Sequence, residues 1–100
     1  MTFHIPGALR QFCEGRSQVD IECGPAILHD ALAELWRIYP GLRDRLVTEQ
    51  GQLRAHINIF VGDENIRYLG GLATPVLADS VISIIPAISG GLIWIRRMSH

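Results

Sequence analysis

Residues 81–88 are the most uniformly apolar strand-length segment of this 100-residue chain. They read Val-Ile-Ser-Ile-Ile-Pro-Ala-Ile. A strand that is apolar on both faces is typical of the covered middle of a sheet. The sequence therefore predicts a last strand in the centre of a sheet, with Ile82 and Ile84 pointing into the core.

The rest of the chain carries strand and helix patterns in turn. Residues 3–12 and 18–23 flank a turn at Gly15-Arg16, so we expect them to form a hairpin. Residues 25–39 are predicted to form one amphipathic helix, because apolar residues recur there at three- and four-residue spacing: Leu28, Ala31, Leu32, Leu35, Trp36 and Tyr39. Residues 57–61 alternate as a third strand, and after the turn at 62–65 we expect a short strand over 66–69 and a loop over 70–78.

The predicted order is strand, strand, helix, strand, short strand, strand. One helix laid across a sheet, with further strands returning to that sheet, is an α+β pattern. The arrangement that suits this order is a β-grasp, with a mixed sheet of four to five strands. We expect the last strand to lie parallel beside the first.

Charge and hydropathy exclude several classes of protein. The net charge is −1, so no basic field is available to hold nucleic acid or an anionic membrane. Residues 1–10 lack the long apolar stretch of a signal peptide. The longest apolar region, 76–95, is interrupted by Asp79, Pro86 and Gly90-Gly91, so it does not read as a membrane span. We therefore expect a cytoplasmic protein that binds neither nucleic acid nor membrane.

The cysteines and histidines point to no metal site. Cys13 is expected at the hairpin turn and Cys23 at its far end, too distant for a disulfide bond. There is no Cys-x-x-Cys pair, and the four histidines are scattered. The sequence predicts free thiols, no bound metal and no bound cofactor.

The last predicted strand leads into Ser89-Gly90-Gly91. Glycine lets a backbone approach another surface closely, which suits a terminus that must enter a narrow enzyme channel. The other interpretation is a flexible loop before one more strand over 92–95. Because the pair follows an apolar strand at the end of the domain, we favour a chemically used terminus.

Five segments, in this order, are similar to the MoaD/ThiS family of ubiquitin-like sulfur carriers. The resemblance covers residues 3–91 and is closest to its longer members, the molybdopterin-synthase small subunit and the carrier of cysteine synthesis. The segments are Tyr39-Pro-Gly-Leu42, Ile57-Asn-Ile-Phe-Val61, Asn65-Ile-Arg-Tyr-Leu69, Leu72-Ala-Thr-Pro75 and Val81-Ile-Ser-Ile-Ile-Pro-Ala-Ile-Ser-Gly-Gly91. Each is weak alone, and together they are specific.

This resemblance implies a protein substrate rather than an enzyme. In the family, an E1-like enzyme uses ATP to adenylate the terminal glycine carboxylate. A sulfur donor then displaces AMP, and the resulting thiocarboxylate delivers sulfur to a biosynthetic enzyme. Carried over to this chain, the activated carboxylate is that of Gly91, and Gly90 and Ser89 form the tail that reaches the enzyme.

The chain departs from the family by continuing for nine residues, 92–100. Gly91 has no free carboxylate until Leu92 to His100 are removed. Some relatives carry a short extension that a peptidase removes, often a zinc-dependent one, so we expect such an enzyme to cut between Gly91 and Leu92. The alternative is that the extension stays and carrier function is lost, which leaves a β-grasp binding module with an inert terminus. A ubiquitin-like modifier whose terminus is not used for sulfur transfer is the other alternative.

Phe60 and Ile85 are predicted on the sheet face that points away from the helix. An apolar patch on an open face usually marks an interaction surface. The other interpretation is that loops or the C-terminal extension cover both side chains. We expect this pair to dock the activating enzyme or the sulfur acceptor.

Overall fold

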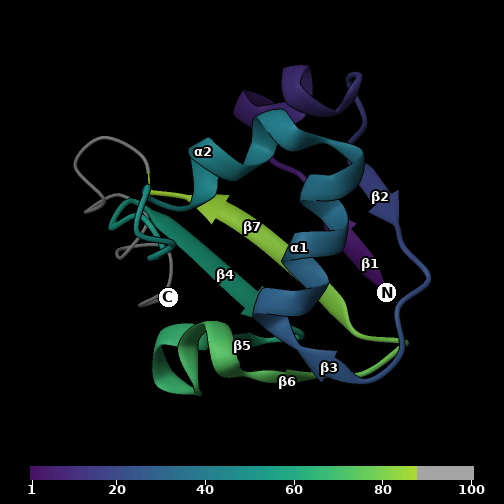
Figure 1. The fold of residues 1–100 in the computed structure, drawn as a ribbon, viewed down its shortest axis with the longest axis vertical. Helices are drawn as coiled ribbons and strands as arrows, with labels where there is room; N and C mark the ends of the chain where they lie inside the picture. Colours follow the sequence, from purple (N-terminus) through teal and green to yellow (C-terminus); the bar gives the residue numbers. More distant parts are fainter. Residues whose placement is uncertain (88–100) are drawn as a thin grey trace, which may run out of the picture.

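The computed structural model describes residues 1–87, and its centre is a five-stranded mixed sheet. Its strands, in spatial order, are β2 (Gln18–Asp20), β1 (Thr2–His4), β7 (Val81–Pro86), β4 (Ile57–Val61) and β5 (Glu64–Asn65) (Figure 1). The β1–β7 pair is parallel, and the other pairs are antiparallel. The predicted β-grasp is confirmed, including the central last strand parallel to the first.

Helix α1 (Leu28–Ile38) lies across one face of this sheet (Figure 1). The helix begins three residues later than predicted. Ala26 and Ile27 instead form strand β3, which pairs with β6 (Pro75–Val76) in a second, two-stranded sheet. The Leu28 N–H donates to the Thr74 carbonyl at 2.8 Å, so this small sheet holds the backbone extended up to the first helical residue.

The prediction that residues 3–12 form the first arm of a hairpin is wrong after His4, where β1 ends. After Pro6 the chain forms a 3₁₀ helix, η1 (Gly7–Cys13), which buries Leu9 and Cys13. Cys13 is therefore a core residue rather than a turn residue. Glu14 ends η1 in the left-handed region with φ 59°, and the chain then returns as β2.

The segment predicted as a short strand over 66–69 is also different. It forms a 3₁₀ helix, η3 (Ile66–Tyr68), because the Asn65 Oδ1 accepts the Arg67 N–H at 2.9 Å and caps a turn. Three further short helices complete the connections: η2 (Pro40–Leu42), α2 (Arg43–Leu46) and η4 (Gly71–Ala73).

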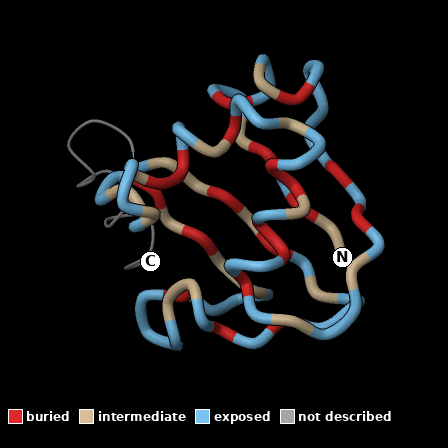
Figure 2. Tube along the Cα trace, viewed as in Figure 1, coloured by how far each residue is buried: buried red, intermediate tan, exposed pale blue. Residues whose placement is uncertain are grey.

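The core lies between α1 and the sheet, and buried residues recur along both α1 and the strands that it covers (Figure 2). Ile82 and Ile84 on β7 are 0% and 2% exposed, as predicted. All but one of the six predicted helix positions are buried; Tyr39, just past the helix end, packs against the core and is partly exposed. None of the helices within residues 1–87 is both long and apolar enough to cross a membrane.

Candidate tail root and docking face

Strand β7 leads to the chain's carboxyl-terminal segment, and the last described backbone hydrogen bond before that segment joins Ala87 to the residue preceding β4. The Ala87 N–H donates to the His56 carbonyl at 2.6 Å. We call these two residues and their neighbours Pro86 and Ile57 the tail root. Ser89, Gly90, Gly91 and Leu92, with the predicted cleavage site, lie outside the described residues. Four residues span at most about 14 Å, which limits how far Gly91 can lie from Ala87.

Pro86 fits at the tail root because of the strand register. Ile57 is its Cα partner on β4. His56 and Ala87 share a hydrogen bond, so the adjacent pair, Ile57 and Pro86, is of the non-hydrogen-bonded type. Pro86 has no N–H to donate and breaks no ladder bond there.

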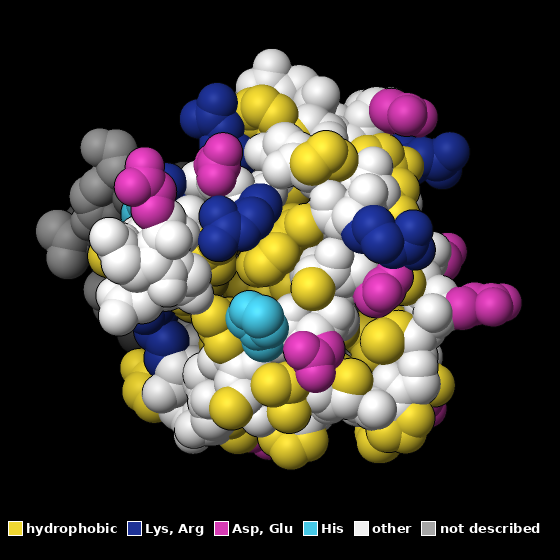
Figure 3. Space-filling view, viewed as in Figure 1, with side chains coloured by type: hydrophobic (Ala, Val, Ile, Leu, Met, Phe, Trp, Pro, Cys, Tyr) yellow, Lys and Arg dark blue, Asp and Glu magenta, His cyan; other side chains and the backbone are white. Residues whose placement is uncertain are grey.

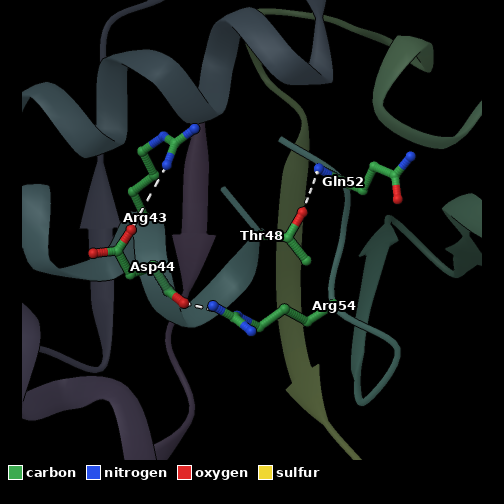
Figure 4. Close-up of polar contacts among 5 residues, drawn as sticks. All are labelled: Arg43, Asp44, Thr48, Gln52 and Arg54. Carbon is green, nitrogen blue, oxygen red and sulfur yellow. Dashed lines mark hydrogen bonds and ion pairs between the residues drawn. The ribbon is translucent and has the colours of Figure 1, made fainter. Parts of the chain in front are cut away.

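The turn before β4 is held from the α2 side. The Arg54 Nε donates to the Asp44 carbonyl at 2.7 Å (Figure 4). The Arg54 backbone N–H donates to the Leu46 carbonyl at 2.9 Å. Within the turn, the Ile57 N–H donates to the Arg54 carbonyl at 3.0 Å. The carbonyl of His56 is thus presented to β7 by a turn that is tied to a helix.

Phe60 and Ile85 lie on the sheet face opposite α1, as predicted. Phe60 is the Cα partner of Ser83, and Ile85 is the partner of Asn58, so the two side chains are diagonal neighbours on one face. Both are partly exposed. Val81, on the same face of β7, is 41% exposed. We call Phe60, Val81 and Ile85 the apolar strip.

The β1 and β2 side of this face is polar. Thr2 donates from Oγ1 to the Asp20 carboxylate at 2.8 Å, and His4 and Gln18 occupy the neighbouring outward positions. The apolar strip is therefore confined to β4 and β7. The opposite, α1 side of the molecule carries arginine and acidic side chains interspersed (Figure 3).

A pocket of about 470 Å³ opens beside Phe60 and is lined, among others, by Tyr68 and Arg67. Tyr68 is 85% exposed. The strand expected over residues 66–69 gave no indication that Tyr68 lies on the surface beside Phe60. The Asn65 side chain that caps η3 was the available signal, since asparagine favours such local turns.

The cysteines are free thiols, and the predicted absence of a bridge between them agrees with the structure. Burial raises the pKa of the Cys13 thiol, while a backbone hydrogen bond at Arg16 and the nearby Arg10 and Arg16 charges act in the opposite direction. Within residues 1–87, no three His, Cys, Asp or Glu side chains are grouped so as to hold a metal ion.

Comparison with known families gives one match over residues 3–91, to the ThiS family model. A curated relative is the sulfur carrier protein CysO of Mycobacterium tuberculosis. It is 33% identical over 93 residues, which cover 91% of this chain and 98% of that protein. The small archaeal modifier protein 3 of Haloferax volcanii is 32% identical over 66 residues, covering 66% of this chain and 71% of that protein.

Solved structures give the same grouping. CysO in the BexX/CysO complex of Amycolatopsis orientalis superposes with a TM-score of 0.81 at 32% identity, covering 90% of this chain and 98% of that chain. SAMP1 of Haloferax volcanii superposes with a TM-score of 0.72 at 28% identity, covering 91% of this chain and 98% of that chain.

Proposed function

This chain belongs to the ThiS family of ubiquitin-like sulfur carriers, and we propose that the carboxylate of Gly91 is its working group. After residues 92–100 are removed, an E1-like enzyme adenylates that carboxylate and a sulfur donor converts it to a thiocarboxylate. The thiocarboxylate then gives its sulfur to an enzyme of cofactor or amino-acid biosynthesis. The protein is a carrier, and its partners supply the catalysis.

One observation carries this proposal. Strand β7 sits between β1 and β4, and on the β4 side its backbone hydrogen bonds continue to Ala87. The four residues that follow would extend Gly91 from a fixed point on a rigid sheet. A carrier needs this arrangement because its reactive atom must enter another protein's active site.

The chemistry assigns each step to a partner. A carboxylate oxygen of Gly91 attacks the α-phosphate of ATP, and pyrophosphate leaves. A sulfur nucleophile then attacks the acyl carbon and AMP leaves. Since a carboxylate is a poor electrophile without such activation, ATP is a substrate of the activating enzyme rather than a cofactor of this chain. The need for ATP fits a cytoplasmic setting.

We assign docking to the apolar strip, with Phe60 and Ile85 as its centre. Its position beside the tail root supports this role, because a partner that covers the strip would have the tail within reach. The BexX/CysO complex supports the idea that relatives meet a separate protein partner. A peptidase, with a zinc enzyme as the class to test first, would cut between Gly91 and Leu92.

The decisive experiment compares the full-length chain with a form that ends at Gly91. Each is incubated with an E1-like enzyme and ATP, then with a sulfur donor, and intact mass is measured. We expect the Gly91-ended form to become an adenylate and then gain the mass of a sulfur-for-oxygen exchange. The full-length chain should do neither. Equal activation of both forms would mean that Gly91 is not the site.

A second function is favoured by the relatives named as small archaeal modifier proteins. In that case the Gly91 carboxylate would form an isopeptide bond with a lysine of another protein. Mass spectrometry of cell extracts distinguishes the two: lysines that carry a remnant of this tail indicate a modifier, and a free thiocarboxylate indicates a carrier.

A further inference from the structure

Arg67 makes more side-chain hydrogen bonds than its exposed position would suggest. Its Nη2 lies 2.7 Å from the Ile57 carbonyl, 3.2 Å from the Arg54 carbonyl and 3.3 Å from the Ala55 carbonyl. Its Nε donates to the Asn58 Oδ1 at 3.3 Å. All four acceptors belong to residues 54–58, so one guanidinium spans the turn and the start of β4.

The strand register explains why this turn needs an outside donor. The Ile57 carbonyl faces away from β7, because Ile57 and Pro86 are a non-hydrogen-bonded pair. Its next neighbour would be β5, but β5 ends at Asn65. Arg67 follows within η3 and supplies the donor that a longer β5 would have given. A planar guanidinium presents several N–H groups in a fixed fork, which suits grouped acceptors.

Two asparagines fix the guanidinium in this position. The Asn65 Oδ1 accepts the Arg67 backbone N–H at 2.9 Å, and the Asn65 Nδ2 donates to the Asn58 Oδ1 at 3.3 Å. The Asn58 amide oxygen thus accepts hydrogen bonds from both the Asn65 Nδ2 and the Arg67 Nε. The three side chains form a closed network on the edge of β4.

The residue enclosed by this network is His56. Arg67 binds the carbonyls of Ala55 and Ile57, on either side of it, and the His56 carbonyl holds the Ala87 N–H. Arg54 ties the same turn to α2 from the other side. The turn that binds Ala87 at the tail root is therefore held by hydrogen bonds from two arginine side chains, Arg54 and Arg67; we call this arrangement the arginine clamp.

We propose that Arg67 is a positioning residue for activation of the carboxyl terminus. It acts through the backbone: it fixes the turn whose His56 carbonyl accepts the Ala87 N–H at the end of β7. Without Arg67 the Ala87–His56 bond opens more often, and Gly91 reaches the enzyme in a productive orientation less often. This inference rests on the proposed function for its kinetic part alone.

The test uses Arg67→Met, which keeps an unbranched side chain and removes every side-chain N–H donor. Arg37→Met is the matched control, because Arg37 is an exposed arginine on α1 whose side chain pairs with Glu34 of the same helix. Amide hydrogen exchange is followed by NMR on the full-length chain. We expect Ala87 and Ile57 to exchange about 10-fold faster in Arg67→Met, as for loss of one hydrogen bond to a charged group. The amides of β1 should be unchanged.

The kinetic arm uses the form that ends at Gly91, which keeps every described residue. With an E1-like enzyme, Arg67→Met should lower kcat by about 10-fold, because loss of orientation slows the step itself. KM should stay within about twofold of the unsubstituted protein, since the apolar strip is intact. A general loss of stability would not lower kcat by about 10-fold while leaving KM within about twofold.

The outcomes separate the two proposals. If the unsubstituted Gly91-ended form is not activated, the proposed function fails, and the exchange arm still decides on the clamp. Unchanged exchange at Ala87 in Arg67→Met overturns the inference. Should Arg67→Met fail to fold by circular dichroism, Arg67→Lys replaces it, because a lysine cannot reach Ile57 and Asn58 at once; wild-type exchange and kcat in that variant also overturn it.

Discussion

Phe3 and Ile82 are partners in the parallel β1–β7 pair, and both side chains are fully buried under α1. This pair joins the third residue of the chain to the strand that leads to the tail. Parallel partners require a crossover connection, so the helix and the rest of the sheet lie between them in sequence. A substitution that weakens packing of this pair should therefore also destabilise β7, the strand that leads to the tail root.

The first prediction concerns how much burial of Ile82 contributes to the free energy of unfolding. Ile82→Ala removes a side chain that is 0% exposed, and we expect it to reduce the free energy of unfolding by about 2–5 kcal/mol, from lost apolar burial plus the cavity left behind. Leu77→Ala is the control, because Leu77 is 59% exposed and such changes usually stay within about 0.5 kcal/mol. Urea denaturation measures both. Equal effects would contradict the burial assigned to β7.

The second prediction concerns the two thiols. Cys23 is partly exposed and should react with an alkylating reagent in the folded protein, whereas Cys13, buried at the end of η1, should react only after denaturation. Burial raises the Cys13 pKa, so the thiolate that would react is also disfavoured. Intact mass after timed labelling gives the result. Equal labelling rates, or a Cys13–Cys23 bridge, would contradict it.

The same shift sets a direction for stability with pH. A thiol whose pKa is higher in the folded state favours folding while it is neutral. This contribution is complete below the thiol's unfolded pKa of about 8.5. It is lost as the pH rises through the higher folded value. We expect Cys13→Ala to remove part of the decline in stability at alkaline pH, measured by urea denaturation across that range.

The sheet was predictable and its connections were not, for a physical reason. The apolar pattern of residues 81–86 reports burial directly, so the central place of the last strand and the inward positions of Ile82 and Ile84 followed from it. The 3₁₀ helices η1 and η3 depend on local hydrogen bonds, such as that of the Asn65 side chain. Periodicity does not carry that information.

The candidate site divides in the same way. The face of Phe60 and Ile85 followed from alternation, because each is paired across β4 and β7. The role of Arg67 could not be predicted, since it depends on where β5 ends and on which side of β4 the Ile57 carbonyl points. Register and strand length become known only from the folded chain.

The third prediction addresses the slim tail. In the form that ends at residue 91, Gly91→Val should lower adenylation by about 100-fold, because displacement of a reacting group by about 1 Å can have that effect. Ser89→Ala, which keeps a small side chain farther from the terminus, should remain close to the unsubstituted protein. Rates of pyrophosphate release measure both variants. If Gly91→Val reacts at the normal rate, the channel around the terminus is not narrow.

The last prediction separates docking from tail chemistry. Phe60→Asp places a charge in the middle of the apolar strip, and we expect binding to the activating enzyme to weaken by more than about 2 kcal/mol, since an apolar anchor of an interface often contributes that much. Leu77→Asp is the matched control: it introduces the same charge at another exposed apolar residue, before the start of β7 and away from the tail root.

Calorimetric titration gives the affinities of these two variants for the activating enzyme, with circular dichroism as the folding control. Because Phe60 lies on the face opposite α1, its variant should keep the native spectrum. A folded Phe60→Asp protein that binds as tightly as Leu77→Asp would remove the strip from the docking surface, and kcat with saturating enzyme would then show whether the tail alone guides the carboxylate to its partner.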